Sequence, residues 1–514
     1  MLTLLLLSLL PSSFQEAVAE AVQDPAAQAA DDTFPLRVED VVRLVGQNAP
    51  AFHQARLRAL ASVAGIEEAE GIFDPVLFGD LTYSYGENPT SGGLFAGGLP
   101  AQHVRSWQAQ QGLRSVLVTG ATVQVAISEN YTEDNLPQSF FGFNPQSDVG
   151  LNFNVTQPLL RGGWLVNGTY GVRSAELAAG QAGAGVRQSE TAAVQGAVDA
   201  YWDLAFAIED VKVKQLSLKL AEELREVTLA KFRVGSAAEV EVVQTDADIA
   251  VRTEALLTAR NLVAQVQDRL RLLLFPLEDP GDWNLVFLPV SQPPAPEGTG
   301  LAWESAFQVA MEHRADLRQL GIDLEQKRLD WDVARRNQLP KLDLIASGNS
   351  SGTARQIADA FETTRGFYFV GYSLGLAFEL PLGNRQFDGA SRRNRYAFEL
   401  AQRTLRDKQN EVATEVREAV RNLNYQAERV KATELASRVA QRQLQAEQRR
   451  LQEGASTNFQ VLQFQRDLET ALSGEKNARM EYAKAAIRLQ TVQGLNWDGS
   501  LPASARPGPE PAQE

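Results

Sequence analysis

The 514-residue sequence contains no cysteine. This absence excludes disulfide bonds, thiolate metal sites and acylation of an N-terminal cysteine. Histidine is almost as scarce: the three that occur, His53, His103 and His313, lack the spacing of metal ligands. The net charge of −15 and the pI near 5.0 argue against nucleic acid as a partner.

Long apolar runs are also missing, with one exception. Leu2–Leu10 is strongly apolar, but it has only about half the length that a bilayer-spanning helix needs. Small residues follow it, so we interpret residues 1–22 as a secretory signal peptide, with the apolar N-terminus of a soluble protein as the alternative. No other segment has 18 consecutive apolar residues, and we expect no transmembrane helix in the mature chain.

Motifs of catalysis are missing as well. The glycine-rich segment 91–100 is followed neither by Lys-Ser/Thr nor by a helix start, so it does not indicate a phosphate site. Acidic pairs such as Glu222 and Glu223 lie in long helical stretches and are most simply solvated faces. The sequence thus predicts a protein that is not an enzyme and has no cofactor and no metal site.

What the sequence has instead is an internal repeat. An offset of 265 residues aligns, without a gap, Glu39 with Glu304, Ala69 with Ala334 and Pro75 with Pro340. Further on, KFRVGSAAEVEVVQ (231–244) aligns with RLQEGASTNFQVLQ (450–463). A unit that occurs twice and combines strands with long helices restricts the possible folds. We assign the first repeat to residues 36–274 and the second to residues 301–496.

Strand patterns occur at matching places in the two repeats. Apolar residues alternate with mostly small or uncharged polar residues in the segments 76–85, 149–157, 341–344 and 370–380. This alternation is typical of a wall with lipid on one side and water on the other, and equally of a half-buried soluble sheet. We expect the strands within about 76–158 in the first repeat and about 341–380 in the second.

Helices occupy most of the remaining sequence. Residues 36–72 are predicted to be helical, and proline-free stretches with apolar residues every seven positions predict helical hairpins over residues 166–274 and 386–494. Each hairpin is expected to turn back at a glycine, Gly235 or Gly454. Three segments are predicted to lie outside the repeats: a disordered lead-in (23–35), a linker between the repeats (275–300) and a disordered proline-rich tail (497–514).

These patterns together predict an α+β membrane protein. Because lipid does not tolerate open strand edges, the strands must close into a transmembrane β-barrel, and four to six strands are fewer than the eight or so that close one. The barrel is therefore expected to close only in an oligomer, in which each chain contributes a sector. The same symmetry would arrange the helical hairpins into a hollow ring, so that barrel and ring together form a duct.

A family resemblance is carried by QPLLRGGW (157–164), LPKLDL (339–344), ELPLGNR (379–385) and the segments around Gly235 and Gly454. In these motifs the sequence resembles the TolC family of outer membrane efflux proteins. The resemblance implies a homotrimer in the outer membrane, with a twelve-stranded β-barrel on a periplasmic α-barrel of twelve helices. It also implies a passive duct for efflux or type I secretion, supplied by an inner-membrane pump of the RND, ABC or major-facilitator type through a periplasmic adaptor.

The resemblance also implies roles for residues at the hairpin ends. Adaptor contact is implied for Phe232, Arg233, Val234, Gly235 and Ala238 at the first tip and for Gly454, Ala455 and Ser456 at the second. Candidates for the periplasmic gate are Glu241, Gln244, Asp246, Gln460 and Gln463. Well-known members narrow this entrance with aspartates where this sequence has Gln460 and Gln463, so we expect a neutral or differently built gate.

An insertion sets the first repeat apart from the family pattern. Pro75 and Pro158 are 83 residues apart, whereas Pro340 and Pro381 are 41 residues apart. Two β-branched runs on either side of a Thr-Gly turn predict an extra hairpin near residues 107–128. This hairpin could add strands to each sector and widen the barrel, or it could fold over the extracellular mouth. We favour the mouth.

Two other functions stay open from the residues alone. A periplasmic coiled-coil structural protein would explain the heptads, but not the strands at matching places in both repeats. A periplasmic adaptor also has a long helical hairpin, but one in each chain rather than two in tandem. The outer membrane channel accounts for the repeat, the strands and the hairpins together.

Overall fold

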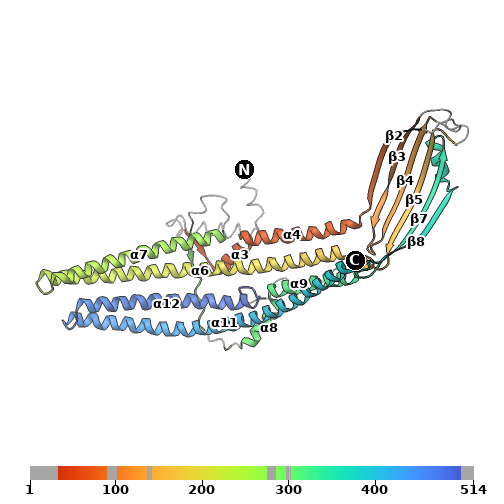
Figure 1. Ribbon diagram of the computed structural model, residues 1–514. Helices are drawn as coiled ribbons and strands as arrows, with labels where there is room; N and C mark the ends of the chain where they lie inside the picture. Colours follow the sequence, from red (N-terminus) through yellow and green to blue (C-terminus); the bar gives the residue numbers. More distant parts are fainter. Residues whose placement is uncertain are drawn as a thin grey trace, which may run out of the picture. The chain divides into compact units, whose positions relative to one another are not determined.

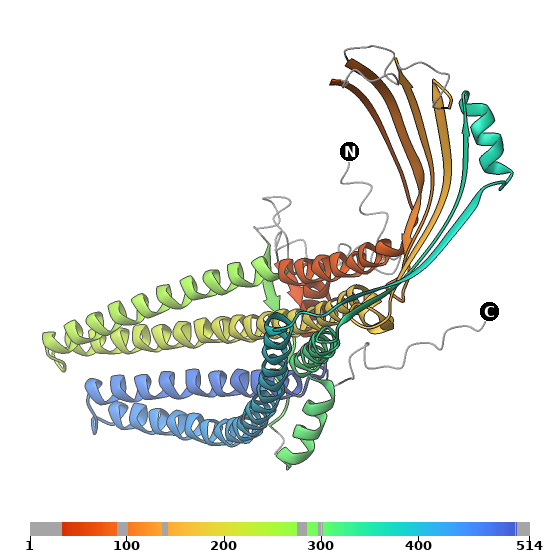
Figure 2. The same ribbon diagram turned by 45° about the vertical axis from the view of Figure 1, so that its right-hand side comes forward.

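The computed structural model describes residues 33–89, 101–135, 142–274, 285–296, 300, 302–498 and 500 (Figures 1 and 2). The predicted signal peptide and nearly all of the predicted lead-in and tail lie outside these residues. The chain forms two compact units, and each takes segments from both repeats. Unit 1 comprises Met1–Arg56, Gly185–Asp316 and Gln409–Glu514, and unit 2 comprises Leu57–Ala184 and Leu317–Lys408.

Unit 2 contains a six-stranded sheet in the order β2-β3-β4-β5-β7-β8 (Figure 2). Its strands are β2 (Val76–Pro89), β3 (Ala101–Val116), β4 (Thr122–Asp134), β5 (Gln146–Pro158), β7 (Lys341–Ala354) and β8 (Val370–Glu379). Every neighbouring pair is antiparallel. The β5–β7 pair joins the strands of the first repeat directly to those of the second.

The two faces of this sheet differ in chemistry, because successive side chains of a strand point to opposite faces. We call one of them the apolar face; one row across it contains Leu77, Leu113, Val125, Phe153 and Tyr372. The side chains at both ends of this row are exposed, Leu77 by 78% and Tyr372 by 92%. We call the other the polar face; a row across it contains Thr82, Gln108, Asn130, Asp148 and Thr353.

The inserted hairpin forms β3 and β4 and lies within the sheet, between β2 and β5. The prediction that it folds over the mouth is therefore wrong. Its strands pair along their length, β3 with β2 from Ala101 to Arg114 and β4 with β5 from Thr122 to Thr132. The sequence located the turn but contained no signal for the strand partners. Among the described residues this sheet thus has six strands, whereas a twelve-stranded barrel shared by three chains requires four from each.

A short helix that the sequence patterns did not indicate, α10 (Ile357–Arg365), covers the apolar face of β5 and β7. Thr364 Oγ1 donates to the carbonyl of Val149 at 2.9 Å, and Ser350 Oγ donates to the carbonyl of Thr364 at 2.8 Å. A Cβ at Gly352 would lie 2.3 Å from the carbonyl oxygen of Ala360, so this close approach requires glycine. Nine residues are too few for periodicity to reveal a helix.

Several helices lie directly before or after strands of this sheet in the sequence. They are α4 (Pro50–Glu70) with the short η3 (Gly71–Phe73), α5 (Trp164–Gly168), α6 (Tyr170–Arg233), α9 (Ala315–Arg336) and α11 (Arg385–Gln452). Within unit 2, Tyr170 of α6 donates to Asp330 of α9 at 2.9 Å. Trp331 of α9 stacks on Phe398 of α11 with ring centroids 5.7 Å apart. In each repeat a helix precedes the first strand and a long helix follows the last strand, as the repeat requires.

Unit 1 contains the far parts of the long helices and a set of shorter elements. These are β1 (Thr33–Leu36), α3 (Val38–Asn48), α7 (Glu239–Leu274), β6 (Val286–Pro289), α8 (Trp303–His313) and α12 (Asn458–Val492). β1 and β6 form a parallel pair, in which Phe34 packs edge-on against Phe287 at 6.5 Å. The prediction of disorder is therefore wrong for residues 33–35, because this pairing orders them.

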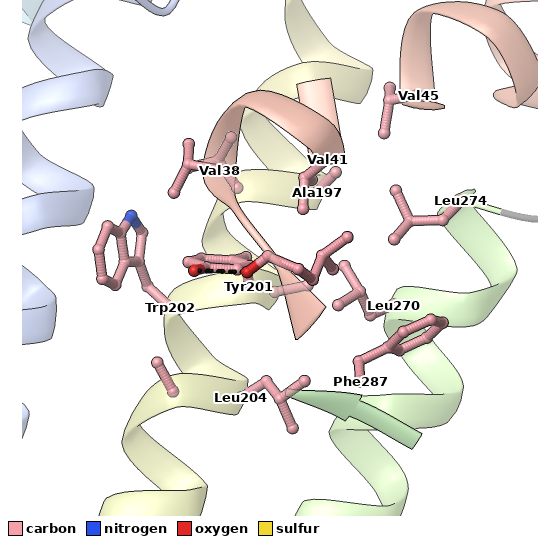
Figure 3. Packing of buried hydrophobic residues seen from close by; sticks show 14 of the residues in the cluster. Val38, Val41, Val45, Ala197, Tyr201, Trp202, Leu204, Leu270, Leu274 and Phe287 are labelled. Carbon is pink, nitrogen blue, oxygen red and sulfur yellow. Dashed lines mark hydrogen bonds between the residues drawn. The ribbon is translucent and has the colours of Figure 1, made fainter. Parts of the chain in front are cut away.

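The core of unit 1 forms where α3, α6 and α7 meet the β1–β6 pair (Figure 3). Its fully buried side chains include Leu36, Val41, Val198, Tyr201, Leu204, Leu270, Leu274 and Phe287. Tyr201 donates to the carbonyl of Leu36 at 3.1 Å and accepts from the N–H of Ser291 at 3.0 Å. Burial raises the pKa of Tyr201, so its hydroxyl remains protonated at neutral pH.

Among the residues that the structure describes, none of the helices combines enough length with enough apolar character to cross a membrane.

Candidate functional site

Each helical hairpin ends in the same kind of turn. Gly235 has φ +78°, its N–H donates to the carbonyl of Phe232 at 2.9 Å, and Ser236 N–H donates to Lys231 at 2.9 Å. Gly454 has φ +76°, and the matching bonds to Leu451 and from Ala455 to Arg450 measure 3.3 and 2.8 Å. This is the Schellman motif, in which a left-handed glycine closes a helix. The two glycines that the repeat aligned thus have the same structural role.

The first tip exposes apolar side chains to solvent. Val234 is 79% exposed and Phe232 is 41% exposed. Arg233 and Ala238 are exposed too, so all the residues implied for adaptor contact at this tip are accessible in one chain. An exposed apolar patch with a basic neighbour is a common form of protein-binding surface.

The second tip is stabilised by hydrogen bonds and an ion pair between residues of its own hairpin. Ser456 Oγ donates to Glu447 Oε1 at 2.5 Å and lies 3.0 Å from the side-chain amide of Gln460. Glu447 is only 5% exposed and also pairs with Arg450 at 3.0 Å. Thr457 caps α12 by accepting from the N–H of Gln460 at 3.4 Å. Gly454 and Ala455 are exposed, whereas Ser456 is partly buried by these contacts.

Asn458 connects the two tips. Its side-chain Nδ2 donates to Thr228 Oγ1 of α6 at 3.0 Å and to Glu241 Oε2 of α7 at 2.7 Å. Asn458 is 3% exposed and Thr228 is fully buried. A second link runs from Lys231 Nζ to the carbonyl of Leu451 at 3.5 Å. Within unit 1 the ends of the two hairpins are therefore bonded to each other.

Away from the tips, α6 and α12 are joined by a series of contacts that we call the polar ladder. Its pairs are Thr228–Asn458, Leu220–Gln465, Ser217–Glu469, Lys214–Glu469, Asp210–Ser473, Glu209–Lys476 and Asp203–Lys484. Positions fall along α6 as they rise along α12, as antiparallel neighbours require. The ladder extends along about 38 Å of helix.

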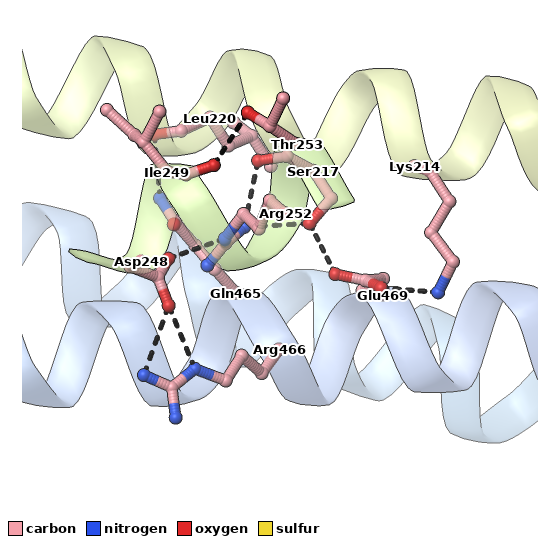
Figure 4. Close-up of polar contacts among 10 residues, drawn as sticks. All are labelled: Lys214, Ser217, Leu220, Asp248, Ile249, Arg252, Thr253, Gln465, Arg466 and Glu469. Carbon is pink, nitrogen blue, oxygen red and sulfur yellow. Dashed lines mark hydrogen bonds and ion pairs between the residues drawn. The ribbon is translucent and has the colours of Figure 1, made fainter. Parts of the chain in front are cut away.

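A buried charged cluster lies in the middle of the ladder (Figure 4). Arg252 Nε pairs with Asp248 Oδ2 at 2.5 Å, and Arg252 Nη1 donates to the carbonyl and the hydroxyl of Ser217, both at 2.8 Å. Ser217 in turn donates to Glu469 at 2.5 Å. Arg466 of α12 reaches the other oxygen of Asp248 at 3.1 Å. The cluster thus ties α6, α7 and α12 together.

Two carboxylates of the ladder, Glu469 and Glu209, are ionised at neutral pH. Burial alone would raise the pKa of Glu469, but hydrogen bonds from Lys214 and Ser217 and the charges of Lys214 and Arg252 outweigh it and lower the pKa. The same holds for Glu209: burial alone would raise its pKa, but the hydrogen bonds and charges of Lys212 and Lys476 outweigh burial, and the pKa is lowered. Both carboxylates therefore act as charged acceptors, which are the stronger kind.

The predicted gate residues have different surroundings. Glu241 is partly buried and bonded to Asn458. Asp246 is exposed and pairs with Arg225 of the same hairpin. Gln460 lies beside Ser456, and Gln463 donates to Asp467 Oδ1 at 3.0 Å. Gln244, Gln460 and Gln463 are all exposed. Of these five residues, Glu241 is the one hydrogen-bonded to the other hairpin.

Several residues of the site were missed by sequence reasoning: Ser217, Glu447, Asp248, Arg252, Asn458, Arg466 and Glu469. A partial signal existed for two of them. Asp248 and Arg252 are four residues apart on α7, in line with the buried Thr245, Leu256 and Ala259. A polar pair in such a seam predicts a buried contact between helices, but which helix covers it cannot be read from α7 alone.

Over the described ranges, no cluster of three or more His, Asp and Glu side chains is arranged to hold a metal ion.

Comparison with known proteins gives a family match. The family described as "Outer membrane efflux protein" matches residues 41–274 and 306–495. These ranges include most of both repeats and leave out the segment between them.

Two curated proteins of Pseudomonas aeruginosa are similar to parts of the chain. The pyoverdine export outer membrane protein OpmQ is 25% identical over 336 residues, which are 62% of this chain and 64% of OpmQ. The alkaline protease secretion protein AprF is 22% identical over 302 residues, which are 58% of this chain and 60% of AprF. The chain thus spans less than two thirds of the length of each of these relatives.

The fold is similar to that of a solved outer membrane protein. The outer membrane protein VceC of Vibrio cholerae has a TM-score of 0.65 at 16% sequence identity, with 90% of this chain and 96% of VceC covered. At this level of identity the likeness concerns the fold.

Proposed function

Because the chain belongs to the outer membrane efflux protein family, we propose that it is the outer membrane channel of a tripartite efflux system or a type I secretion system. The family is one of outer membrane proteins rather than enzymes, and the protein is located in the outer membrane. In this proposal the channel is a passive exit duct. An inner-membrane pump of the RND, ABC or major-facilitator type delivers the substrate through a periplasmic adaptor.

One observation supports the proposal most: a sheet with an exposed apolar face and long helical hairpins belong to the same chain. An apolar face opposite a polar face is typical of a wall between lipid and water. The helices α6, α7, α11 and α12 have 64, 36, 68 and 35 residues. A periplasmic coiled-coil protein would account for the helices but would leave the apolar face of the sheet without a purpose.

The duct requires more than one chain in this proposal. Three copies would close the sheets into a transmembrane β-barrel and the hairpins into a periplasmic α-barrel. The physical reason is that unpaired strand edges are not tolerated in lipid. Two similar hairpins in each chain would give the ring six similar positions for adaptors.

We propose that the hairpin tips bind the adaptor. The residues concerned are Phe232, Arg233, Val234, Gly235 and Ala238 at the first tip and Gly454, Ala455 and Ser456 at the second. The exposed apolar side chains of the first tip, Phe232 and Val234, support this assignment, because they lie where α6 ends and are accessible to a partner.

We also propose that the periplasmic gate lies near the tips, with Glu241, Gln244, Asp246, Gln460 and Gln463 around it. The Asn458 bonds and the polar ladder would hold the two hairpins of a chain together in the closed state. Opening would then require that one hairpin move against the other, at the expense of these bonds.

Membrane fractionation and planar-bilayer recording test this function. The protein should be released from the outer membrane only with detergent, as a heat-modifiable trimer, and should conduct ions after reconstitution. Cells that lack the protein should retain ethidium or fail to release a secreted polypeptide, and the intact chain should restore export. Release without detergent, together with an absence of ion conduction, would contradict the proposal.

A further inference from the structure

The sheet of unit 2 has two edges that remain open in a single chain. β2 and β8 each pair on one side, and among the described residues no strand pairs with the other side of either. β8 is exposed at every residue except Gly371, and β2 at every residue except Phe78 and Gly86. In lipid, such rows of free N–H and C=O groups cost several kcal/mol each, so both edges must be covered.

The inserted β3–β4 hairpin is an integral part of this sheet, and its turn is hydrogen-bonded to β5. Its turn is held by Thr119, whose Oγ1 donates to Gln157 Oε1 at 2.9 Å, while Gln157 Nε2 donates to the carbonyl of Thr119 at 3.2 Å. A Cβ at Gly168 would lie 2.0 Å from the carbonyl oxygen of Val118, so the turn fits closely against α5. A hairpin that folded over a mouth would have no such anchors at this end.

The chemistry of the faces continues through the hairpin. Tyr83, Trp107 and Tyr131 occupy one row of the apolar face, and the rings of Tyr83 and Trp107 are 4.7 Å apart. A row of aromatic residues beside an apolar band is typical of the membrane interface of a barrel. The same face also contains Gln111 of β3 and Glu129 of β4, but Leu113, Val125 and Ile127 keep it mostly apolar. Strands β3 and β4 therefore have the pattern of barrel strands over most of their length.

We propose that three copies of this chain close a barrel of eighteen strands, with β8 of one copy paired to β2 of the next. The inference rests on the proposed function, from which it takes the number of copies. With six strands in alternating directions, β8 runs opposite to β2, so the joining pair is antiparallel like all the others. The apolar residues of β2 and β8 share one face, so closure makes a continuous apolar belt.

The consequence is a wider exit. Barrel diameter grows roughly in proportion to strand number, so eighteen strands give about 1.5 times the diameter of twelve. Barrels of about sixteen to eighteen strands enclose an aqueous channel rather than a filled interior. The barrel would then admit cargo too bulky for a twelve-stranded one, such as an unfolded polypeptide with its side chains.

Disulfide trapping tests whether the hairpin is part of the barrel in the membrane, and the absence of native cysteine makes every thiol an introduced one. The pair Thr82→Cys and Gln108→Cys joins neighbouring strands and should form a disulfide within the chain. The pair Thr82→Cys and Asp148→Cys is separated by three strand spacings, about 14 Å, and should remain reduced because disulfides require about 7 Å or less. A bond in the second pair would overturn the inference.

A second trapping experiment addresses the joint between copies. Ser84→Cys on β2 is combined in turn with Gly371→Cys, Ser373→Cys and Gly375→Cys on β8, because the register between copies is free to vary. At least one combination should link copies into covalent dimers and trimers on a denaturing gel. The control pair, Ser128→Cys on the interior strand β4 with Ser373→Cys, should link none.

Deletion of residues 101–134 tests the width directly. The deletion leaves β2 and β5 antiparallel, with the same face of each strand turned to the same side. In whole cells, Ser347→Cys on the polar face is labelled with maleimide-polyethylene glycols of increasing size. The largest polymer that reacts should be about 1.5 times wider for the full chain than for the deletion variant.

The outcomes separate this inference from the proposed function. If both forms are outer membrane trimers with the same size limit, the eighteen-strand barrel is wrong and the channel remains. If the full chain forms no membrane trimer, the proposed function itself is wrong. Electron cryomicroscopy of the intact trimer would count the barrel strands directly and so test the number eighteen without any variant.

Discussion

The two hairpins of one chain start from the same turn and then differ. Counted from the tip glycines, Asp248 of α7 and Asp467 of α12 have the same position, as do Arg252 and Ala471. Asp248 is 7% exposed and is held by Arg252 and Arg466, whereas Asp467 is exposed and accepts from Gln463. The repeat therefore determines the turn, but the burial of a carboxylate depends on which helix covers it.

Because of this difference, the two hairpins contribute different chemistry to the interface between them. The first hairpin contributes a charged pair to the seam. At the corresponding place the second contributes Ala471, which packs against an apolar cluster that includes Leu224, Leu444 and Leu462. A charged group facing a polar ladder can be disrupted selectively, whereas an apolar seam loses packing more gradually.

The largest effect is expected from Arg252→Ala. It leaves Asp248 buried without its nearest partner, and loss of one member of a buried ion pair costs about 3–5 kcal/mol. The thermal midpoint of the helices, followed by circular dichroism, should fall by several degrees. Arg260→Ala, an exposed arginine on the same helix, is the control and should change stability by less than about 0.5 kcal/mol. Equal effects would show that the cluster is unimportant.

A smaller effect is expected from Asn458→Ala at the link between the tips. The change removes two hydrogen bonds and leaves Thr228 and Glu241 without their donor, at a cost of about 1–3 kcal/mol. If these bonds hold the gate closed, conductance in planar bilayers should rise as well. Glu239→Ala, at the same distance from the first tip glycine and exposed, should leave both stability and conductance unchanged.

The comparison also shows what the sequence could predict and why. The repeat identified both tip glycines, because a left-handed turn needs glycine whatever its surroundings. Apolar residues seven positions apart do not all stay buried along α6, since Val213 is 6% exposed but Val227, two heptads later, is 48% exposed. A straight helix has 3.6 residues per turn, so a strict period of seven leaves the buried side within a few turns. Here the seam continues through Leu224 and Thr228 instead.

Contacts distant in sequence were the part that could not be predicted. Strand alternation in β3 and β4 fixed their two faces but not their neighbours, which depend on register with β2 and β5. Likewise, Glu469 gives no sign along α12 that it will meet Lys214 and Ser217 of α6.

A third prediction tests the likeness of the two turns. Gly235→Ala and Gly454→Ala each place a side chain at positive φ and should cost about 1 kcal/mol. Neither glycine has a heavy atom within 4 Å of where its Cβ would lie, so backbone strain is the whole effect and the two costs should match. Urea unfolding of each variant measures this. A difference much larger than the error would mean that the tips are not equivalent turns.

A fourth prediction concerns acid pH. The folded pKa of Glu469 is lowered from its ordinary value of 4.5, so the stabilisation is complete above pH 4.5 and is lost as pH falls through the folded pKa. The wild type should therefore lose stability in this acid range. Glu469→Gln should be less stable at neutral pH and less sensitive to acid. Parallel stability curves for the two proteins would contradict the ladder as an ionic contact.

The smallest change in stability, below about 0.5 kcal/mol, is expected from Gln460→Asp with Gln463→Asp, because both side chains are exposed. Their effect should be on ion block. Three copies would bring six added carboxylates to the entrance, and oxygen ligands of this kind bind divalent cations, so the half-blocking concentration should fall several-fold in single-channel recordings. The matched control is Gln244→Asp compared with Gln463→Asp alone, because each adds three carboxylates and Gln244 is as far from Gly235 as Gln463 is from Gly454. If both hairpins line the entrance equally, the control will block as strongly. A stronger block from Gln463→Asp would mean that the second hairpin alone forms the gate, and no added block from either would remove both positions from it.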